Sequence, residues 1–280
     1  MTDILVIGSV NLDLSASVSR LPEPGETVTG AELHRFGGGK GANQALAACR
    51  LGANVKLIAS VGNDANATES LTLLHDGGVD LSHCVIDEHA ATGVALICVA
   101  PSGENHIVVA PGANARLASG SFEIPPAEAL ICQLEIPAET ITQVAAEFPG
   151  FMCINLAPAC EVDAALLARA DLIVVNETEA AWYGDKLMKC KGFIATTHGA
   201  RGAEITKNGE LVARAESPAV NAIDTTGAGD TFTAALTLAL VEGQTPERAL
   251  NFACAAGAAA TTKRGAQPSL PTRAEVESVL

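Results

Sequence analysis

The chain has 280 residues, an ordinary length for one α/β domain with a small appendage. Asp and Glu outnumber Lys and Arg by 32 to 17, the formal net charge is -15, and aromatic residues make up 3% of the chain. Such a composition argues against nucleic acid and anionic membranes as partners. The 8 cysteines show no Cys-x-x-Cys pair, and we find neither a signal peptide nor a membrane-spanning stretch. We therefore expect a reduced, cytoplasmic protein.

The first apolar run, Ile4 to Gly8, is typical of a buried parallel strand. The residues after it lack the Gly-x-Gly-x-x-Gly pattern of a dinucleotide fold, which counts against an NAD-dependent enzyme. Asn11 and Asp13 come just past this strand, and ligands of open α/β sheets bind at the carboxyl ends of strands. A plain Asx turn is the alternative for these two side chains.

Four further segments read as strands outside the main sheet. Two of them, Leu14 to Val18 and Thr27 to Phe36, mix small, polar and β-prone residues. The other two, residues 93–99 and 105–109, flank Pro101-Ser102-Gly103 and predict a hairpin. We expect a small separate sheet whose strands lie within about residues 14–36 and 92–110.

A glycine cluster precedes the first predicted helix, in the stretch from Phe36 to Ala45. It is not a phosphate-binding P-loop, because Gly41 follows Lys40 where Ser or Thr is needed, and His34 occupies the place of the first glycine. Glycines at a helix entry instead let a ligand approach the backbone closely. The helix itself is predicted over residues 41–51.

The rest of the chain alternates between strands and helices, which predicts a doubly wound, mostly parallel sheet flanked by helices. No internal repeat or long linker divides it, so we expect one domain over residues 1–280. Asn208-Gly209 indicates a tight hairpin. The expected strands are residues 55–61, 129–134, 151–155, 172–175 and 192–197, and the expected helices are residues 65–75, 138–147, 162–168, 246–262 and 274–280.

A Gly-x-Gly turn opens an apolar helix within the stretch from Asp224 to Asp230. Unpaired N–H groups at a helix start attract phosphate. Asp230, in the first turn, would be placed to take a proton from a hydroxyl aimed at that phosphate. The alternative is that Asp230 is only a favourable charge at a helix start and that the glycines only form a turn.

Two stretches, Phe36 to Ala45 and Asp224 to Asp230, resemble the two sequence motifs of the ribokinase-like (PfkB) family of carbohydrate kinases. Four shorter stretches resemble ribokinase members in particular, so the resemblance spans nearly the whole chain. They are Pro24-Gly25-Glu26-Thr27, Asn155-Leu156-Ala157-Pro158-Ala159, Asn176-Glu177-Thr178-Glu179 and Gly265-Ala266-Gln267-Pro268-Ser269.

The resemblance implies a ribokinase-like fold in which the small sheet is a lid over the sugar and joins two chains into a homodimer. It implies ATP-dependent phosphorylation of the primary hydroxyl of a pentose, ribose above all. Deoxyribose, a nucleoside or another small sugar is the alternative substrate. A sugar-binding relative without turnover is a further alternative.

The resemblance also implies a role for each matched residue. Asp230 would be the general base, beside an anion hole formed by Gly227, Ala228 and Gly229. The sugar hydroxyls would be bound by Asn11, Asp13, Gly39, Lys40, Asn43 and Glu135. The nucleotide would lie against Asn176, Thr197, Gly199, Arg201, Gly202 and Cys254. Glu179 would be tied to Mg²⁺ through water, and K⁺ would be held by Asp224, Thr226, Ala260, Lys263, Gly265 and Ser269.

Three features on the nucleotide side call for comparison with the structure. Asn176 and Glu179 also fit a plain helix N-cap, since Asn at the cap with Glu three residues later forms a capping box. The connection from Glu179 to Thr197 is shorter than the family usually has, and we expect it to lack a helix, with the loss of a strand as a further alternative; either would bear on nucleotide binding. Cys254 stands where the family often has histidine.

Overall fold

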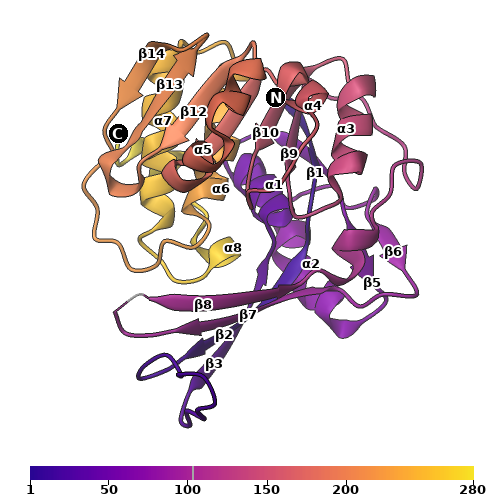
Figure 1. Ribbon diagram of the computed structural model, residues 1–280, viewed down its shortest axis with the longest axis vertical. Helices are drawn as coiled ribbons and strands as arrows, with labels where there is room; N and C mark the ends of the chain where they lie inside the picture. The colour runs from indigo at the N-terminus through magenta and orange to yellow at the C-terminus, as the bar shows by residue number, and fades with distance from the viewer. Residues whose placement is uncertain (103) are drawn as a thin grey trace.

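The computed structural model describes residues 1–102 and 104–280. A large mixed sheet lies between two layers of helices, and a second, four-stranded sheet projects from one side of it (Figure 1). None of the described helices is both long and apolar enough to cross a membrane. The doubly wound α/β architecture with a separate small sheet confirms the predicted fold class.

The main sheet has the order β14-β13-β12-β11-β10-β9-β1-β4. Its neighbouring strands are parallel from β4 to β12, and the last two pairs, β12 with β13 and β13 with β14, are antiparallel, so that β13 alone runs in the opposite direction. The strands are β1 (Asp3–Ile7), β4 (Asn54–Ile58), β9 (Ala129–Gln133), β10 (Phe151–Asn155), β11 (Leu172–Asn176), β12 (Phe193–Thr197), β13 (Ala203–Lys207) and β14 (Glu210–Ala215).

Both faces of the sheet are buried, which explains why its strands are continuous apolar runs. In β1, Ile4 and Val6 pack on one side while Leu5 and Ile7 pack on the other. The first layer holds α1 (Lys40–Arg50), α2 (Ala65–Asp76), α6 (Ala228–Val241), α7 (Pro246–Ala260) and α9 (Arg273–Glu277). The second layer holds α3 (Ala138–Glu147), α4 (Ala164–Arg169) and α5 (Glu177–Tyr183).

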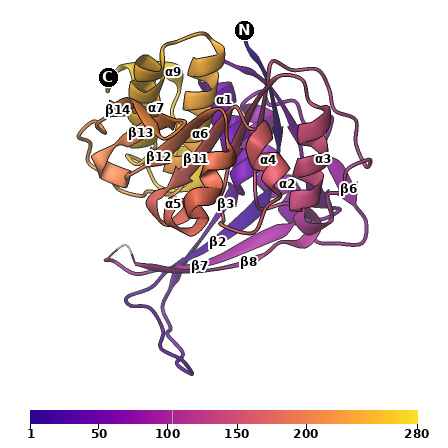
Figure 2. The same ribbon diagram turned by 45° about the horizontal axis from the view of Figure 1, so that its top comes forward.

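The small sheet, which we call the lid, has the order β3-β2-β7-β8. Figure 2 shows it extending away from the main sheet, with the loop between β2 and β3 reaching furthest. Its strands are β2 (Asn11–Ser17), β3 (Glu32–Gly38), β7 (Gly93–Val99) and β8 (Asn105–Ala110). The predicted hairpin of β7 and β8 is confirmed, although Gly103 of its turn lies outside the described residues.

The structure corrects several sequence boundaries. Residues 55–61 are not one strand, because β4 ends at Ile58 and β5 (Ser60–Gly62) leaves the main sheet to pair with β6 (Val85–Asp87). The lid strand predicted from Thr27 begins only at Glu32, and β2 begins earlier than predicted, so Asn11 and Asp13 are lid residues. The helix predicted over 274–280 is α9, which ends at Glu277.

The topology determines where a ligand binds. The chain runs from β1 to β4 on one side and returns to β9 on the other, so the order of strands reverses between β1 and β9. Ligands of open α/β sheets bind at such a switch point, beyond the carboxyl ends of the strands. Ser9 and Glu135, which follow β1 and β9, lie there with the start of α1.

Candidate active site

Asp230 lies in the first turn of α6, a helix that begins after Gly227 in the left-handed conformation, with φ of 80°. Its side chain is buried, and both carboxylate oxygens are held by amides. Asn43 Nδ2 donates to Oδ2 at 2.9 Å, and Gln44 Nε2 donates to Oδ1 at 3.0 Å. Burial raises the pKa of Asp230, although Lys40 and the two amides oppose this. A raised pKa suits a carboxylate that accepts a proton near neutral pH.

Asp13 is buried on β2 against the backbone of Gly38. A Cβ on Gly38 would lie 2.2 Å from Asp13 Oδ2, so only glycine leaves room for the carboxylate. Burial, together with the charges of Glu135 and Asp230, raises the pKa of Asp13 to about 7. Three carboxyl groups thus lie close enough for their charges to interact, and this arrangement suits hydrogen bonding to a polyhydroxylated ligand.

Lys40 supplies the positive charge among these carboxylates. Burial alone would lower its pKa, but the charges of Asp230, Glu135 and Glu179 outweigh burial and raise it. The Lys40 backbone N–H donates to Glu135 Oε2 at 3.0 Å, and the Ser9 hydroxyl donates to the same oxygen. Glu135 therefore joins the end of β9 to the start of α1.

The glycine before Lys40 is required by its surroundings. Gly39 caps α1 with φ of 89°, and a Cβ there would lie 2.8 Å from the backbone of Ser9 and of Asn11. The chain consequently brings β2, the end of β1 and the start of α1 together at one point. All six residues that the sequence predicts at the sugar lie around this point.

Asn114 is a site residue that the sequence analysis misses. Its side chain accepts from Val10 N at 2.9 Å and donates to Asn11 Oδ1 at 2.8 Å. This buried contact fixes the amide orientation of Asn11 across 103 residues of sequence. A single Asn in a Gly-Ala-Asn-Ala run carries no local signal of such a contact.

A hollow of about 490 Å³ lies at the α6 N-terminus, and several of the residues that the sequence analysis expects beside a nucleotide line it. Of the predicted residues, Thr197, Gly199, Gly202 and Cys254 line it, and so do Ala228 and Gly229. None of the described residues lining it is charged. The start of α6 therefore lines the hollow through Ala228 and Gly229, whereas Asp230 in the same turn is held by Asn43 and Gln44.

Asn176, Glu179 and Arg201 have structural partners of their own. Asn176 and Glu179 form a capping box on α5, with reciprocal hydrogen bonds of 2.8 and 2.9 Å. Burial raises the pKa of Glu179. The Arg201 guanidinium lies 2.6 Å from both oxygens of Glu177 and does not line the hollow. After α5 the connection to β12 is completed by a short 3₁₀ helix, Gly184–Lys189.

The segment before α6 is tied to the C-terminal region through Asp224. Its carboxylate accepts from the Thr226 N–H and hydroxyl at 2.9 and 2.6 Å, and from the Gly265 N–H at 2.9 Å. Although burial opposes it, these hydrogen bonds and Arg264 lower the pKa of Asp224, which stays ionised. This contact brings together the two segments that hold the predicted potassium ligands, while Lys263 pairs with Glu275.

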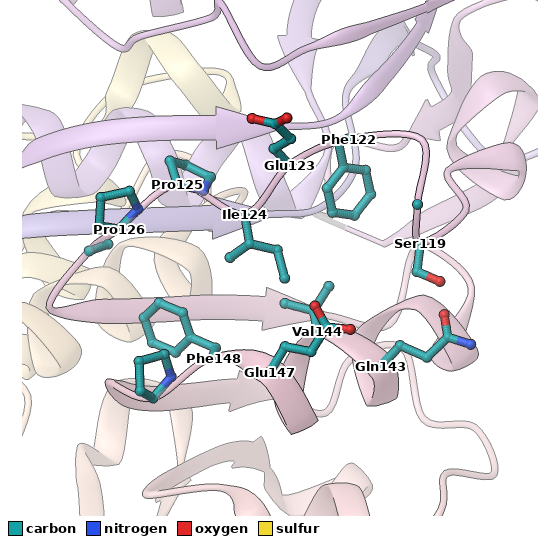
Figure 3. A pocket seen from close by; sticks show the side chains of 13 residues that line it. Ser119, Phe122, Glu123, Ile124, Pro125, Pro126, Gln143, Val144, Glu147 and Phe148 are labelled. Carbon is teal, nitrogen blue, oxygen red and sulfur yellow. The ribbon is translucent and has the colours of Figure 1, made fainter.

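A second hollow, of about 710 Å³, lies between residues 119–127 and the end of α3 (Figure 3). Phe122, Ile124, Val144 and Phe148 form its apolar wall. The lining segment leads into the amino end of β9, so this hollow is at the opposite edge of the sheet from Asp230. Although this hollow is larger than the one at the α6 N-terminus, its distance from Asp230 rules it out as the candidate active site.

Comparisons with known proteins agree with this geometry. Residues 1–273 match the model of the pfkB family carbohydrate kinases. The chain is 37% identical to ribokinase of Haemophilus influenzae, over 97% of this chain and 96% of that one. Ribokinase of Thermotoga maritima superposes with a TM-score of 0.91 at 31% identity, covering 100% and 99% of the two chains. Arabidopsis thaliana ribokinase complexed with ribose and ATP superposes with a TM-score of 0.87 at 30% identity, covering 99% and 98%.

Proposed function

The chain belongs to the pfkB family of carbohydrate kinases, and we propose that it transfers the γ-phosphoryl group of ATP to the primary hydroxyl of D-ribose, giving ribose 5-phosphate. One observation carries this proposal. The buried Asp230 carboxylate lies among the polar sugar residues, while the N-terminus of its own helix lines the nucleotide hollow. A hydroxyl held at Asp230 is thereby aimed at a phosphate held at the helix start.

The reaction in this proposal is an in-line displacement. Asp230 accepts the proton of the sugar hydroxyl as the hydroxyl oxygen attacks the γ-phosphorus, while the bond from the γ-phosphorus to the β–γ bridging oxygen breaks and ADP leaves. The N–H groups of Gly227, Ala228 and Gly229 stabilise the negative charge on the transferred group, because helix N-terminal N–H groups lack partners within the helix. Positioning and charge stabilisation account for most of the catalysis in phosphoryl transfer.

The sugar hydroxyls are held by the groups around Asp13. Asn43 Oδ1 is buried and has no hydrogen-bond partner among the described residues, so it is available to accept from a hydroxyl. Asp13 accepts from neighbouring hydroxyls once it is ionised. Glu135, Lys40, Asn11 and the backbone at Gly39 complete the set.

Two cations belong to the proposal. The described residues contain no group of three or more His, Cys, Asp or Glu side chains that would hold a metal ion alone. Mg²⁺ would accordingly be shared between the nucleotide phosphates and Glu179 through water, neutralising phosphate charge. K⁺ would be held behind the anion hole by the Asp224–Thr226 and Ala260–Ser269 segments, with Asp224 supplying an ionised carboxylate.

The lid supports the proposed homodimer. Apolar side chains on one face of three of its four strands are exposed, with Leu33 at 61%, Leu96 at 51% and Val108 at 64%. Covering such a surface with a second copy of the lid removes it from water. We place this dimer in the cytoplasm and treat residues 1–280 as one domain with its lid.

A coupled assay of ADP release against a panel of sugars and nucleosides tests the proposed activity. We expect D-ribose to give the highest kcat/KM, with 2-deoxyribose, other pentoses and inosine well below it. A higher value for deoxyribose or a nucleoside would reassign the substrate and leave the kinase chemistry in place. No ADP release with any of them would indicate a sugar-binding relative without turnover.

A further inference from the structure

A chain of buried amides runs behind Asp230. Gln44 Nε2 lies 3.0 Å from Asp230 Oδ1 and 3.2 Å from Asn155 Oδ1. Gln44 Oε1 accepts from Gln133 Nε2 at 2.6 Å. Gln44 and Gln133 are fully buried and Asn155 is 7% exposed, and they come from α1, β9 and the end of β10. Segments far apart in the sequence thus meet at one carboxylate.

The directions of the hydrogen bonds in this series of amides follow from Asp230 on one side and from Asn155 on the other. An ionised carboxylate only accepts, so Gln44 must present its NH₂ group to Asp230. Asn155 Nδ2 donates to Val174 O at 3.1 Å, which leaves Asn155 Oδ1 to accept the second N–H of Gln44. The carbonyl of Gln44 then faces β9, where it needs a donor, and the NH₂ group of Gln133 supplies it.

The far end of the chain depends on a glycine. A Cβ on Gly8 would lie 2.0 Å from Gln133 Oε1, so the amide of Gln133 occupies the place of a side chain at this position. Gln44 and Gln133 have no exposed surface with which to touch a sugar. Asn43 differs from them, because it holds the other oxygen of Asp230 and keeps a free acceptor.

We propose that Gln44, held by Gln133 and Asn155, is a positioning residue that fixes the Asp230 carboxylate in the orientation needed to accept the proton of the sugar hydroxyl. This inference rests on the proposed function of Asp230 as the general base. It assigns to Gln44 a role in the reaction without contact to either substrate.

Two substitutions at Gln44 separate positioning from packing. Gln44→Leu keeps a side chain of similar bulk but removes the N–H groups. Gln44→Glu keeps the shape of the side chain but places a second carboxyl group beside Asp230. Loss of a hydrogen bond to a charged group should lower kcat about 10- to 100-fold. The KM for ribose should change less than about threefold, since uniform binding is untouched. Both variants lose an interaction that lowers the pKa of Asp230, so the acid limb of kcat/KM should move to higher pH, further for Gln44→Glu.

If both Gln44 variants fail to fold, a substitution of Gln133, the residue that donates to Gln44, still tests the inference. Gln133→Met removes the donor that orients Gln44 and leaves Asp230 its direct contacts. It should lower kcat about 3- to 10-fold, in keeping with one neutral hydrogen bond, and move the acid limb in the same direction. Thr237→Val is the matched control, because Thr237 is also fully buried and lies on α6, but its hydroxyl donates to Thr233 O at 2.8 Å and makes no hydrogen bond to Asp230 or Gln44 among the described residues.

The outcomes distinguish this inference from the proposed function. Folded Gln44 and Gln133 variants whose kcat and acid limb match those of Thr237→Val would overturn the positioning role. A parent protein that phosphorylates no sugar would overturn the proposed function instead. In that case the pKa of Asp230, measured by ¹³C NMR titration of its carboxyl group, still reports on the hydrogen bond from Gln44. Gln44→Leu must raise its pKa relative to the parent, and an unchanged pKa would overturn the inference.

Discussion

The two halves of the candidate site are formed by different kinds of chemical group. On the proposed sugar side, Asp13, Asn43 and Asp230 are buried polar side chains; amides hold both oxygens of Asp230, and Asn43 Oδ1 has no partner among the described residues. On the nucleotide side, the hollow is lined by small and apolar residues and by the backbone of glycine-rich turns. A site built from buried hydrogen-bonding groups rejects a ligand that leaves them unpaired, whereas apolar contact discriminates weakly. The choice of sugar should therefore depend on a few side chains, and the nucleotide on the shape of the backbone.

The largest effect is expected from the carboxylate between the two halves. Asp230→Asn should lower turnover by at least ~100-fold, because the general base is lost. Ribose binding, measured by calorimetry, should persist because the other sugar residues remain. If turnover stays within a few-fold of the parent, Asp230 is not the base. The two halves of the site would then not meet at this carboxylate.

The next prediction concerns the pH dependence of stability on the sugar side. The pKa of Asp13 is about 7 in the folded protein and about 3.9 in an unfolded chain. The folded state thus binds more protons between these values, and stability falls as pH rises through 7. From about pH 5 to about pH 8, the parent should lose about 1–3 kcal/mol more than Asp13→Asn in urea unfolding. Parallel stability curves would show that Asp13 ionises at ordinary pH.

Potassium tests the loop that connects the anion hole to the C-terminal region. Replacing Na⁺ by K⁺ at constant ionic strength should raise kcat/KM about fivefold or more, since the cation would shape the anion hole through Asp224 and Thr226. The measurement is the coupled assay in chloride salts of the two ions. Equal rates in both salts would argue against a monovalent cation site there.

The smallest effect is expected at Arg201. The sequence predicts it beside the nucleotide, but its exposed guanidinium pairs with Glu177 outside the hollow. Exposed ion pairs contribute little, so Arg201→Ala should change the KM for ATP less than about threefold. A tenfold or larger increase would show that Arg201 turns toward the nucleotide when it binds. It would also make the nucleotide side more dependent on side chains than we infer.

Sequence patterns predict most of the fold because local physics determines it. The apolar runs that form β1, β9 and β10 and the helices between them follow from periodicity and breakers. The prediction fails where tertiary contacts decide. Residues 55–61 contain no Gly or Pro that would end a strand, yet β5 leaves the main sheet to pair with β6.

The candidate site shows the same division. Asn43 and Asp230 belong to the two stretches that resemble the family motifs, and Asp13 comes just past the first apolar strand, so the sequence points to all three residues. Asn114 and Gln133 lie in no such stretch, and their roles depend on contacts with residues about 90 to 100 positions away in the sequence. The capping box of Asn176 and Glu179 was a visible alternative in the sequence and is present in the structure.

The central claim is that buried hydrogen bonds around Asp13 choose the sugar. The most direct measurement is the ratio of kcat/KM for ribose to that for 2-deoxyribose, in the parent and in Asp13→Ala, at saturating ATP. A hydrogen bond to a charged group predicts a parent ratio of about 10 to 100 and a variant ratio near unity, with the KM for ATP unchanged. A parent ratio near unity, or the same ratio in both proteins, would contradict the claim.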